Sequence, residues 1–308
     1  MGTKLSASNL SHHWRVSFEW TLRYILATRK AELAFAQVID GLPTTSTALR
    51  IGVDDMRSDI INRIEPSTDA ISIFQQYREE FDTATIQLDA QALQNHQRAP
   101  FGSVDFKLRL LGLAAVAIHH LAIETFTTLH PDGGPSHPSK APWPGGIYIP
   151  DLFHPNYMCW FQYPRGVAEL VGYWAEAEVF GGTVVSEHDA DEEIILRRAF
   201  IHPPFRPLFE LSTDQLDQFG SLATSPVPTA RATEGHTSRY QNSEATKILP
   251  FSASPQARTK IDVIGRHPLI YRDKYERVPK IYTPGEGCVR RGVVTEEMKE
   301  FVKQLDRK

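Results

Sequence analysis

The sequence lacks several features that would place it in a well-defined class of protein. It has only two cysteines, Cys159 and Cys288, too few for a disulfide framework or a cysteine-rich metal site. It also has no glycine-rich phosphate loop, which argues against P-loop NTPases and ordinary NAD-dependent dehydrogenases. Because so few cysteines are typical of a reducing compartment, the predicted localisation is cytoplasmic.

Long apolar runs and an excess of positive charge are missing as well. The longest apolar run, 110–118, falls well short of the roughly 18 residues of a membrane span, so it predicts a buried helix. The net charge of −4 argues against electrostatic binding of nucleic acid. We therefore expect a small-molecule substrate as the partner, with neither nucleic acid nor membrane, and the oligomeric state is left open.

Apolar residues at three- and four-residue steps predict that the first half of the chain is helical. Trp14, Phe18 and Leu22 begin the first stripe, which follows one face of a helix. The pattern predicts four helices, over 13–39, 54–64, 70–93 and 104–129. The fourth helix is apolar on nearly all sides, so we expect it in the centre of the helical half.

The second half of the chain mixes helix and strand patterns. An apolar repeat at helical spacing predicts a helix over 166–180, ended by Gly181-Gly182. Two short apolar runs predict strands and hence a β-hairpin near 183–201. The predicted fold class is α+β, with an N-terminal helical half packed on a smaller mixed half.

The chain is predicted to form a single domain over 1–308. Its predicted parts are a helical half (10–130), a mixed half (150–219), a loosely packed excursion (220–256) and a basic C-terminal segment (257–308). The excursion is rich in Ser, Thr, Ala and Pro, and the last segment holds 13 basic and 8 acidic residues. We expect one cooperative unit, because the apolar helix around Leu111 needs cover from Leu170 and Trp174.

One stretch of the sequence resembles a known group of proteins. The run from Gly166 to Glu176, followed by Phe180-Gly181-Gly182, is similar to an uncharacterised family of filamentous-fungal hypothetical proteins. The likeness covers about residues 153–202. It implies a fungal source and a place in small-molecule metabolism, and it carries over no functional residue.

The first candidate cluster is His119, His120 and Glu124 on the helix predicted over 104–129. His120 and Glu124 are four residues apart and so share a helix face. A neutral imidazole beside a carboxylate is suited to be a base with its orienting acid, or half of a metal site. A core histidine bonded to a helical neighbour is the alternative interpretation.

The second candidate cluster is Glu169, Tyr173 and Glu176, which lie at i, i+4 and i+7 of the helix predicted over 166–180. Two carboxylates on one face act as acid and base when burial separates their pKa values. A phenol beside them can donate to a developing oxyanion. The alternative interpretation is the solvated face of an amphipathic helix.

The aromatic segment 153–164 is predicted to wall a pocket. Cys159 within it is more typical of a buried residue than of a nucleophile. The candidate substrate-binding residues are His119, His154, Tyr157, Trp160 and His202.

Together these patterns predict an enzyme that acts on a small, largely apolar metabolite by acid/base chemistry, as a lyase, isomerase or cyclase of secondary metabolism. The candidate catalytic residues are His120, Glu124, Glu169, Tyr173 and Glu176. We expect them to share one cavity, with His120 as the base and one glutamate as the acid. No cofactor is expected. The alternatives are a metal-dependent enzyme, with a divalent metal on His120 and Glu124, and a non-catalytic binding or assembly module.

Overall fold

The computed structural model describes residues 3–52, 58–133, 149–188, 196–224, 249–251, 260–261 and 270–272. Its α-helices are α1 (His12–Leu26), α2 (Arg29–Asp40), α3 (Thr45–Arg50), α4 (Ser58–Ile61), α5 (Thr68–Glu80), α6 (Ala90–Arg98), α7 (Val104–Leu129), α8 (Ala168–Phe180) and α9 (Thr213–Ser221). Three short 3-10 helices are η1 (Ala7–Asn9), η2 (Thr83–Thr85) and η3 (Trp160–Gln162). The strands are β1 (Lys4–Ser6), β2 (Gln87–Asp89), β3 (Thr183–His188), β4 (Leu196–His202), β5 (Leu208–Glu210), β6 (Lys260–Ile261) and β7 (Ile270–Tyr271).

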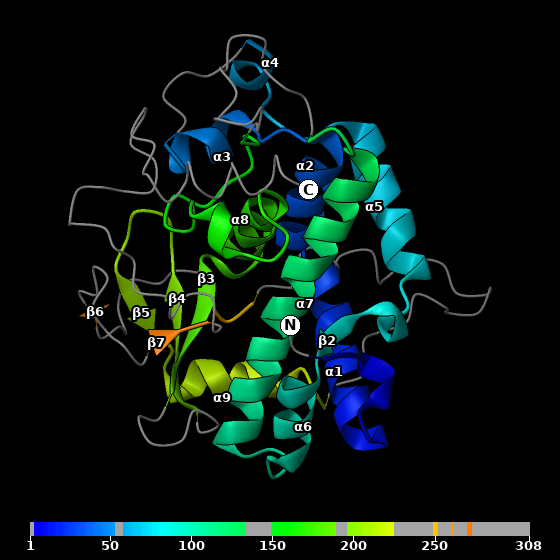
Figure 1. Ribbon diagram of the computed structural model, residues 1–308, viewed down its shortest axis with the longest axis vertical. Coiled ribbons are helices and arrows are strands. Elements are labelled where there is room, and N and C mark those ends of the chain that lie inside the picture. Colours follow the sequence, from blue (N-terminus) through cyan, green and yellow to red (C-terminus); the bar gives the residue numbers. More distant parts are fainter. Residues whose placement is uncertain are drawn as a thin grey trace, which may run out of the picture.

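The predicted α+β class and the predicted hairpin are confirmed. Strands β1 and β2 form one small antiparallel sheet, and the other sheet has the order β6-β5-β4-β3-β7. In the hairpin, β3 and β4 pair antiparallel with Thr183 opposite His202. Figure 1 shows this second sheet on one side of the helices, with α8 next to it.

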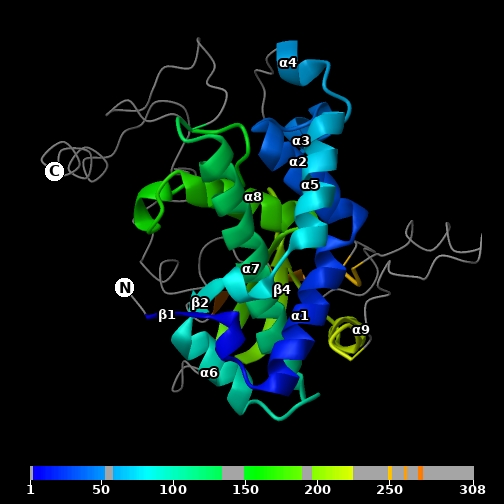
Figure 2. The same ribbon diagram turned by 90° about the vertical axis from the view of Figure 1, so that its right-hand side faces the viewer.

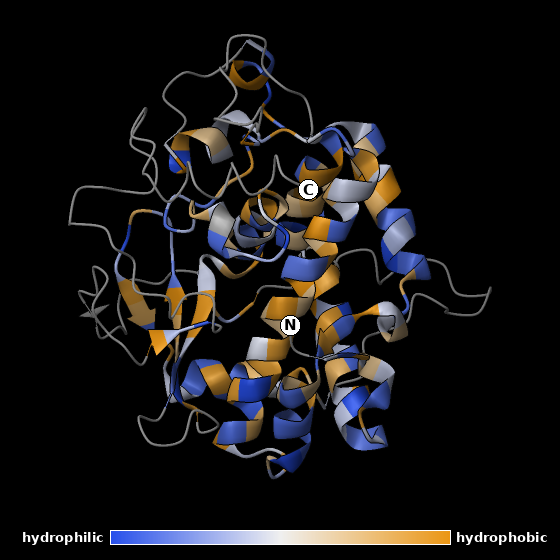
Figure 3. Ribbon diagram, in the orientation of Figure 1, coloured by the Kyte–Doolittle hydropathy of each residue, from blue (hydrophilic) through white to orange (hydrophobic). Residues whose placement is uncertain are grey.

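Helix α7 is the central helix, as its composition predicts, and it spans the predicted residues. The Ser103 side chain accepts a hydrogen bond from the Phe106 backbone N–H and so caps its start. Figures 1 and 2 show α7 running through the middle of the molecule, and Figure 3 shows its apolar residues. It is long and apolar enough to cross a membrane, but 72% of its most apolar window is buried inside the protein, as in a core helix.

The core joins the two predicted halves of the chain. Leu111 of α7 and Trp174 of α8 belong to the same cluster of buried apolar residues, and Leu170 is buried as well. Helices α7 and α8 pack directly on each other, and both also contact α2 and β3. The cover that α7 was expected to need is therefore supplied by α8.

The helix predicted over 13–39 is wrong in one respect, because two helices replace it. The helix is interrupted at Ala27 and Thr28. The Thr28 side chain accepts a hydrogen bond from the Ala31 backbone N–H, which caps the start of α2. Such a cap competes with a continuous helix. The end of α2 is as expected, with Gly41 in the left-handed conformation at φ 70°.

The helix predicted over 70–93 is also wrong beyond Glu80. The Asp82 side chain accepts from the Ala84 backbone N–H and starts a 3-10 turn, and Leu88 pairs with Leu5 in the small sheet. A strand partner more than eighty residues away leaves no local signal.

Two further predictions are tested in part. Of the helix predicted over 54–64, only α4 is found, since residues 53–57 lie outside the described part, and α3 before it was not expected. Most of the predicted excursion and of the basic C-terminal segment also lies outside the described residues. Strand β6 lies near the start of that C-terminal segment.

Candidate active site between two helices

The candidate site lies at a close contact between α7 and α8. His119 of α7 faces Gly172 of α8, and a Cβ atom at Gly172 would lie 2.6 Å from His119 Nε2. Real Cβ atoms do not come so close, so a larger residue would force the imidazole away. The glycine inside this helix therefore makes room for the histidine.

The hydrogen bonds of His119 define its protonation pattern. Its Nε2 lies 2.6 Å from Glu169 Oε2, and its Nδ1 lies 2.9 Å from a guanidinium nitrogen of Arg272. A carboxylate accepts and a guanidinium only donates, so the ring carries its proton on Nε2 and a lone pair on Nδ1. The side chain is 2% exposed, so this lone pair is shielded from bulk water.

Glu169 is the ionised partner of His119. Burial alone would raise the pKa of this carboxyl, but the hydrogen bond from His119 and the positive charges of Arg272 and Arg165 lower it to about 2. The group is therefore a carboxylate throughout the physiological range. Such a carboxylate holds the imidazole in one tautomer and stabilises it when it gains a proton.

Glu176 and Arg272 complete the cluster. Glu176 is fully buried, and its Oε1 accepts from the Val184 backbone N–H at 2.7 Å. Its Oε2 lies 3.0 Å from Arg272 and 3.6 Å from His119 Nδ1. Arg272 follows β7, which pairs with β3 next to α8. Each buried charge thus faces a partner of opposite sign, as burial requires.

Aromatic rings surround the cluster. The Arg272 guanidinium lies over the Tyr173 ring at 5.0 Å, a cation–π contact. Tyr173 stacks on Tyr157 at 4.3 Å between ring centroids, and Tyr163 packs against it at 5.1 Å. The aromatic segment therefore packs against α8.

A second polar group adjoins these rings. His154 donates from Nε2 to the His202 carbonyl and accepts at Nδ1 from the Asn156 backbone N–H. Burial, helped by the charge of His202, lowers the pKa of His154 to about 3, so its ring stays neutral. The Tyr157 hydroxyl contacts His202 Nδ1 at 3.0 Å, which links this group to the Tyr157–Tyr173 stack.

The structure brings together some of the predicted catalytic residues. Glu169, Tyr173 and Glu176 share one buried face of α8, so the solvated-face interpretation is wrong for them. Of the candidate substrate-binding residues, His119 sits in the cluster itself. Tyr157, His154 and His202 lie beside it, whereas Trp160 is buried near Gly166.

The role predicted for His120 and Glu124 in this cluster is wrong. His120 Nδ1 donates to the Gln87 carbonyl at 3.2 Å, and burial lowers the pKa of this histidine to about 3. The Glu124 side chain is 56% exposed and lies 3.9 Å from Arg165. One step along a helix turns a side chain by about 100°, so the neighbour, His119, points at α8 instead.

Other features of the site were not predicted from the sequence. Arg272 was not predicted, because its stretch of the sequence has no clear periodicity; in the structure it follows the two-residue strand β7. The close packing of Gly172 against the His119 ring was also not predicted, although a glycine inside an apolar helix is a signal of close packing. Cys159 is buried and disulfide-bonded, so it is no nucleophile.

The groups needed for a metal centre are not assembled in the described part of the chain. No set of three His, Cys, Asp or Glu side chains there is placed to hold a metal ion. Within the cluster, the cation that faces both His119 Nδ1 and Glu176 is the Arg272 guanidinium.

Comparisons of the chain with protein-family models, curated proteins and solved structures find no significant match. The function is therefore inferred from the chemistry of this site.

Proposed function

We propose that the protein is an enzyme that transfers protons on a small, largely apolar metabolite, as a lyase, isomerase or cyclase. One observation supports this most strongly. The Nδ1 lone pair of His119 lies 2.9 Å from the cationic Arg272, in a site enclosed by protein. A base next to a group that binds negative charge is the arrangement needed to remove a proton beside a carbonyl.

Each member of the cluster has a role in this reaction. Arg272 binds the carbonyl oxygen of the substrate, and His119 Nδ1 takes the proton from the neighbouring carbon. The C–H electron pair moves to the oxygen, giving an enolate paired with the guanidinium. His119 then returns the proton to another carbon, or a leaving group departs with the electron pair. Glu169 stabilises the imidazolium, and Glu176 holds Arg272 in place.

The surroundings favour a substrate of limited polarity. Tyr157, Tyr163 and Tyr173 form one buried aromatic cluster, and such rings contribute apolar surface with few polar atoms. From the fungal resemblance we also propose a place in secondary metabolism. A cytoplasmic location stays a prediction. The disulfide at Cys159 is unusual for that compartment, so thiol titration of the natural protein tests it.

A mass-spectrometric assay in heavy water tests the proposed function. The purified protein is incubated with a small-molecule extract of a filamentous fungus, and compounds are followed for consumption and for deuterium uptake. His119→Gln is compared with His120→Gln, its neighbour on the same helix. Removing a general base lowers a rate by about 10²–10⁴-fold, so we expect turnover by the wild type and by H120Q and almost none by H119Q. Equal turnover by folded H119Q would contradict the assignment.

A non-catalytic module is the second candidate, and one observation favours it. Both ring nitrogens of His119 are already bonded within the protein, as expected of a cluster that only holds β7 against α8. In that case no compound in the extract changes with the wild-type protein. H119Q and E169Q then alter only the free energy of unfolding.

A metal-dependent enzyme is the remaining alternative. It requires His120 and Glu124 as ligands, and these side chains contact Gln87 and Arg165 in the structure. Elemental analysis of the purified protein decides it, since stoichiometric zinc, iron or manganese would support the metal-dependent reaction.

A further inference from the structure

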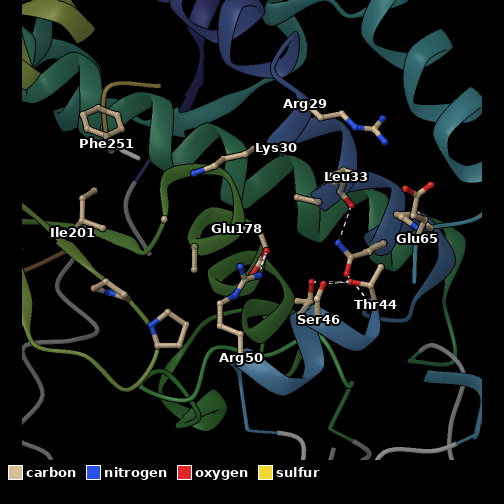
Figure 4. Close-up of a pocket in the computed structure, with 18 of the residues that line it drawn as sticks. Arg29, Lys30, Leu33, Thr44, Ser46, Arg50, Glu65, Glu178, Ile201 and Phe251 are labelled. Atoms are coloured by element: carbon tan, nitrogen blue, oxygen red, sulfur yellow. Dashed lines mark hydrogen bonds and ion pairs between the residues drawn. The ribbon is translucent and has the colours of Figure 1, made fainter. Parts of the chain in front are cut away.

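A cavity of about 770 Å³ lies on another side of α8. Its lining comes from α2, α3, α8 and the chain around β4 and β5 (Figure 4). Ala177 and Glu178 contribute from α8, on sides of the helix turned away from the Glu169–Tyr173–Glu176 face. The volume is in the range of small-molecule sites. None of the His119 cluster lines it, so it is a separate feature.

One part of the lining is apolar. Leu33 of α2, Ile201 of β4 and Phe251 contribute side chains there, and Ile201 and Phe251 are buried. Figure 4 shows Phe251 and Ile201 on the same side of the cavity, with Lys30 between them and Glu178. An aliphatic or aromatic ligand body would bury its surface against these groups.

The charged part of the lining has more cations than carboxylates. Four cations line the cavity against two carboxylates; these residues are Arg29, Lys30, Arg50 and Arg206, with Glu65 and Glu178. Arg50 pairs with Glu178, and Arg29 pairs with Glu32. Among the described residues, no carboxylate lies within ion-pair distance of Lys30 or Arg206. These two cations are available to an anion.

The position of Lys30 adds to this argument. Arg29 and Lys30 are the first two residues of α2, a helix end that already carries a partial positive charge. Cations are unfavourable there, and Glu32 is the one acidic residue in the first turn. Partial burial lowers the pKa of Lys30; the nearby Glu178 carboxylate raises it, and the charge of Arg50 lowers it further. A bound anion would relieve both effects.

We propose that this cavity binds a small amphipathic organic anion. Its acidic group, a carboxylate, sulfonate or phosphate, pairs with Lys30 and lies in the field of Arg50. Its apolar body packs against Ile201 and Phe251. The site is independent of the proton-transfer reaction, so either proposal can fail without the other.

Two fluorescent probes with the same ring system test the proposal. 1-Anilinonaphthalene-8-sulfonate carries one negative charge, and N-phenyl-1-naphthylamine lacks the sulfonate. Lys30→Gln and Arg206→Gln are compared with Arg98→Gln, an exposed cation at the end of α6, away from the cavity. Lys30 and Arg206 form no ion pair in the described chain, so neither substitution leaves a carboxylate without its partner.

The expected result is saturable binding of one sulfonate per chain. A lost charge-assisted hydrogen bond weakens binding by roughly tenfold or more, so we expect that increase in Kd for K30Q and a smaller increase for R206Q. R98Q should bind as the wild type does, and the affinity for the neutral probe should be unchanged by K30Q. Unchanged sulfonate affinity in both K30Q and R206Q would overturn the proposal, as would equal losses for both probes in K30Q.

Discussion

The two sides of helix α8 carry charged residues in different environments. On the side facing α7, Glu169 and Glu176 are buried and paired with His119 and Arg272. On the side facing the cavity, Glu178 pairs with Arg50, whose side chain is 54% exposed, and Lys30 lines the cavity. Glutamates of one helix thus belong to two different environments: a buried network of ion pairs and the lining of a cavity. The partner of each glutamate and its degree of burial determine its role.

The largest expected effect separates Glu176 from Glu178. Glu176→Gln removes the carboxylate that lies 3.0 Å from the buried Arg272 guanidinium, and breaking a buried ion pair costs about 3–5 kcal/mol of the free energy of unfolding. Glu178→Gln leaves Arg50, which is exposed and solvated by water, so the free energy of unfolding should fall by less than about 1 kcal/mol. Urea unfolding of both variants measures the difference, and equal losses would contradict the contrast between the two sides.

The next effect is the acid sensitivity of Glu169. Its folded-state pKa of about 2 lies below the ordinary value of 4.5, so its contribution is complete above pH 4.5 and is lost as the pH falls toward 2. The shift corresponds to about 3 kcal/mol. We expect the stability gap between the wild type and Glu169→Gln to shrink over this interval. Glu124→Gln is the exposed control, and a gap that stays constant with pH would contradict the pairing.

A smaller effect is expected from the contact between Gly172 and His119. Gly172→Ala places a Cβ against the imidazole and displaces it from Glu169, at a cost of about 1–3 kcal/mol. Gly112→Ala in α7 meets no atom within 4 Å, so it should stabilise the protein by up to about 1 kcal/mol. Thermal unfolding compares the two, and a stabilising G172A would show that the helices do not approach closely at this point.

The smallest effect is expected on the cavity side and has the opposite sign. Lys30→Gln removes from the positive end of α2 a cation that forms no ion pair with the described residues, which should stabilise the protein by about 0.3–1 kcal/mol. Urea unfolding in low salt is the measurement. A destabilised K30Q would show that Lys30 supports the fold and is not held ready for an anion.

Periodicity predicted the parts of the fold that depend on local sequence. Helix α7 was predicted over its full length, because a continuous apolar pattern and Ser103 define it. The breaks at Thr28 and Asp82 were missed, since a single side-chain cap ends a helix without changing the apolar stripe. The pairing of β1 with β2 depends on contacts across the chain, which a local pattern does not contain.

The sequence predicted only part of the candidate site. The sequence placed a histidine of α7 beside Glu169 and Glu176, but it selected His120 over His119. The shared face of Glu169, Tyr173 and Glu176 follows from helical spacing. The rotation of α7 about its axis depends on packing at Gly172. Arg272 and Lys30 were missed because their surroundings are defined only by the folded chain.

The most direct test of the account is the tautomer of His119. Two-bond proton–nitrogen NMR spectra of the histidine side chains at pH 8 distinguish the two ring nitrogens, and H119Q assigns the signal. The account predicts a proton on Nε2, bonded to Glu169, and a lone pair on Nδ1 facing Arg272. In E169Q this preference should weaken. A His119 ring protonated at Nδ1, or exchanging freely between tautomers as an exposed histidine does, would contradict the proposed base.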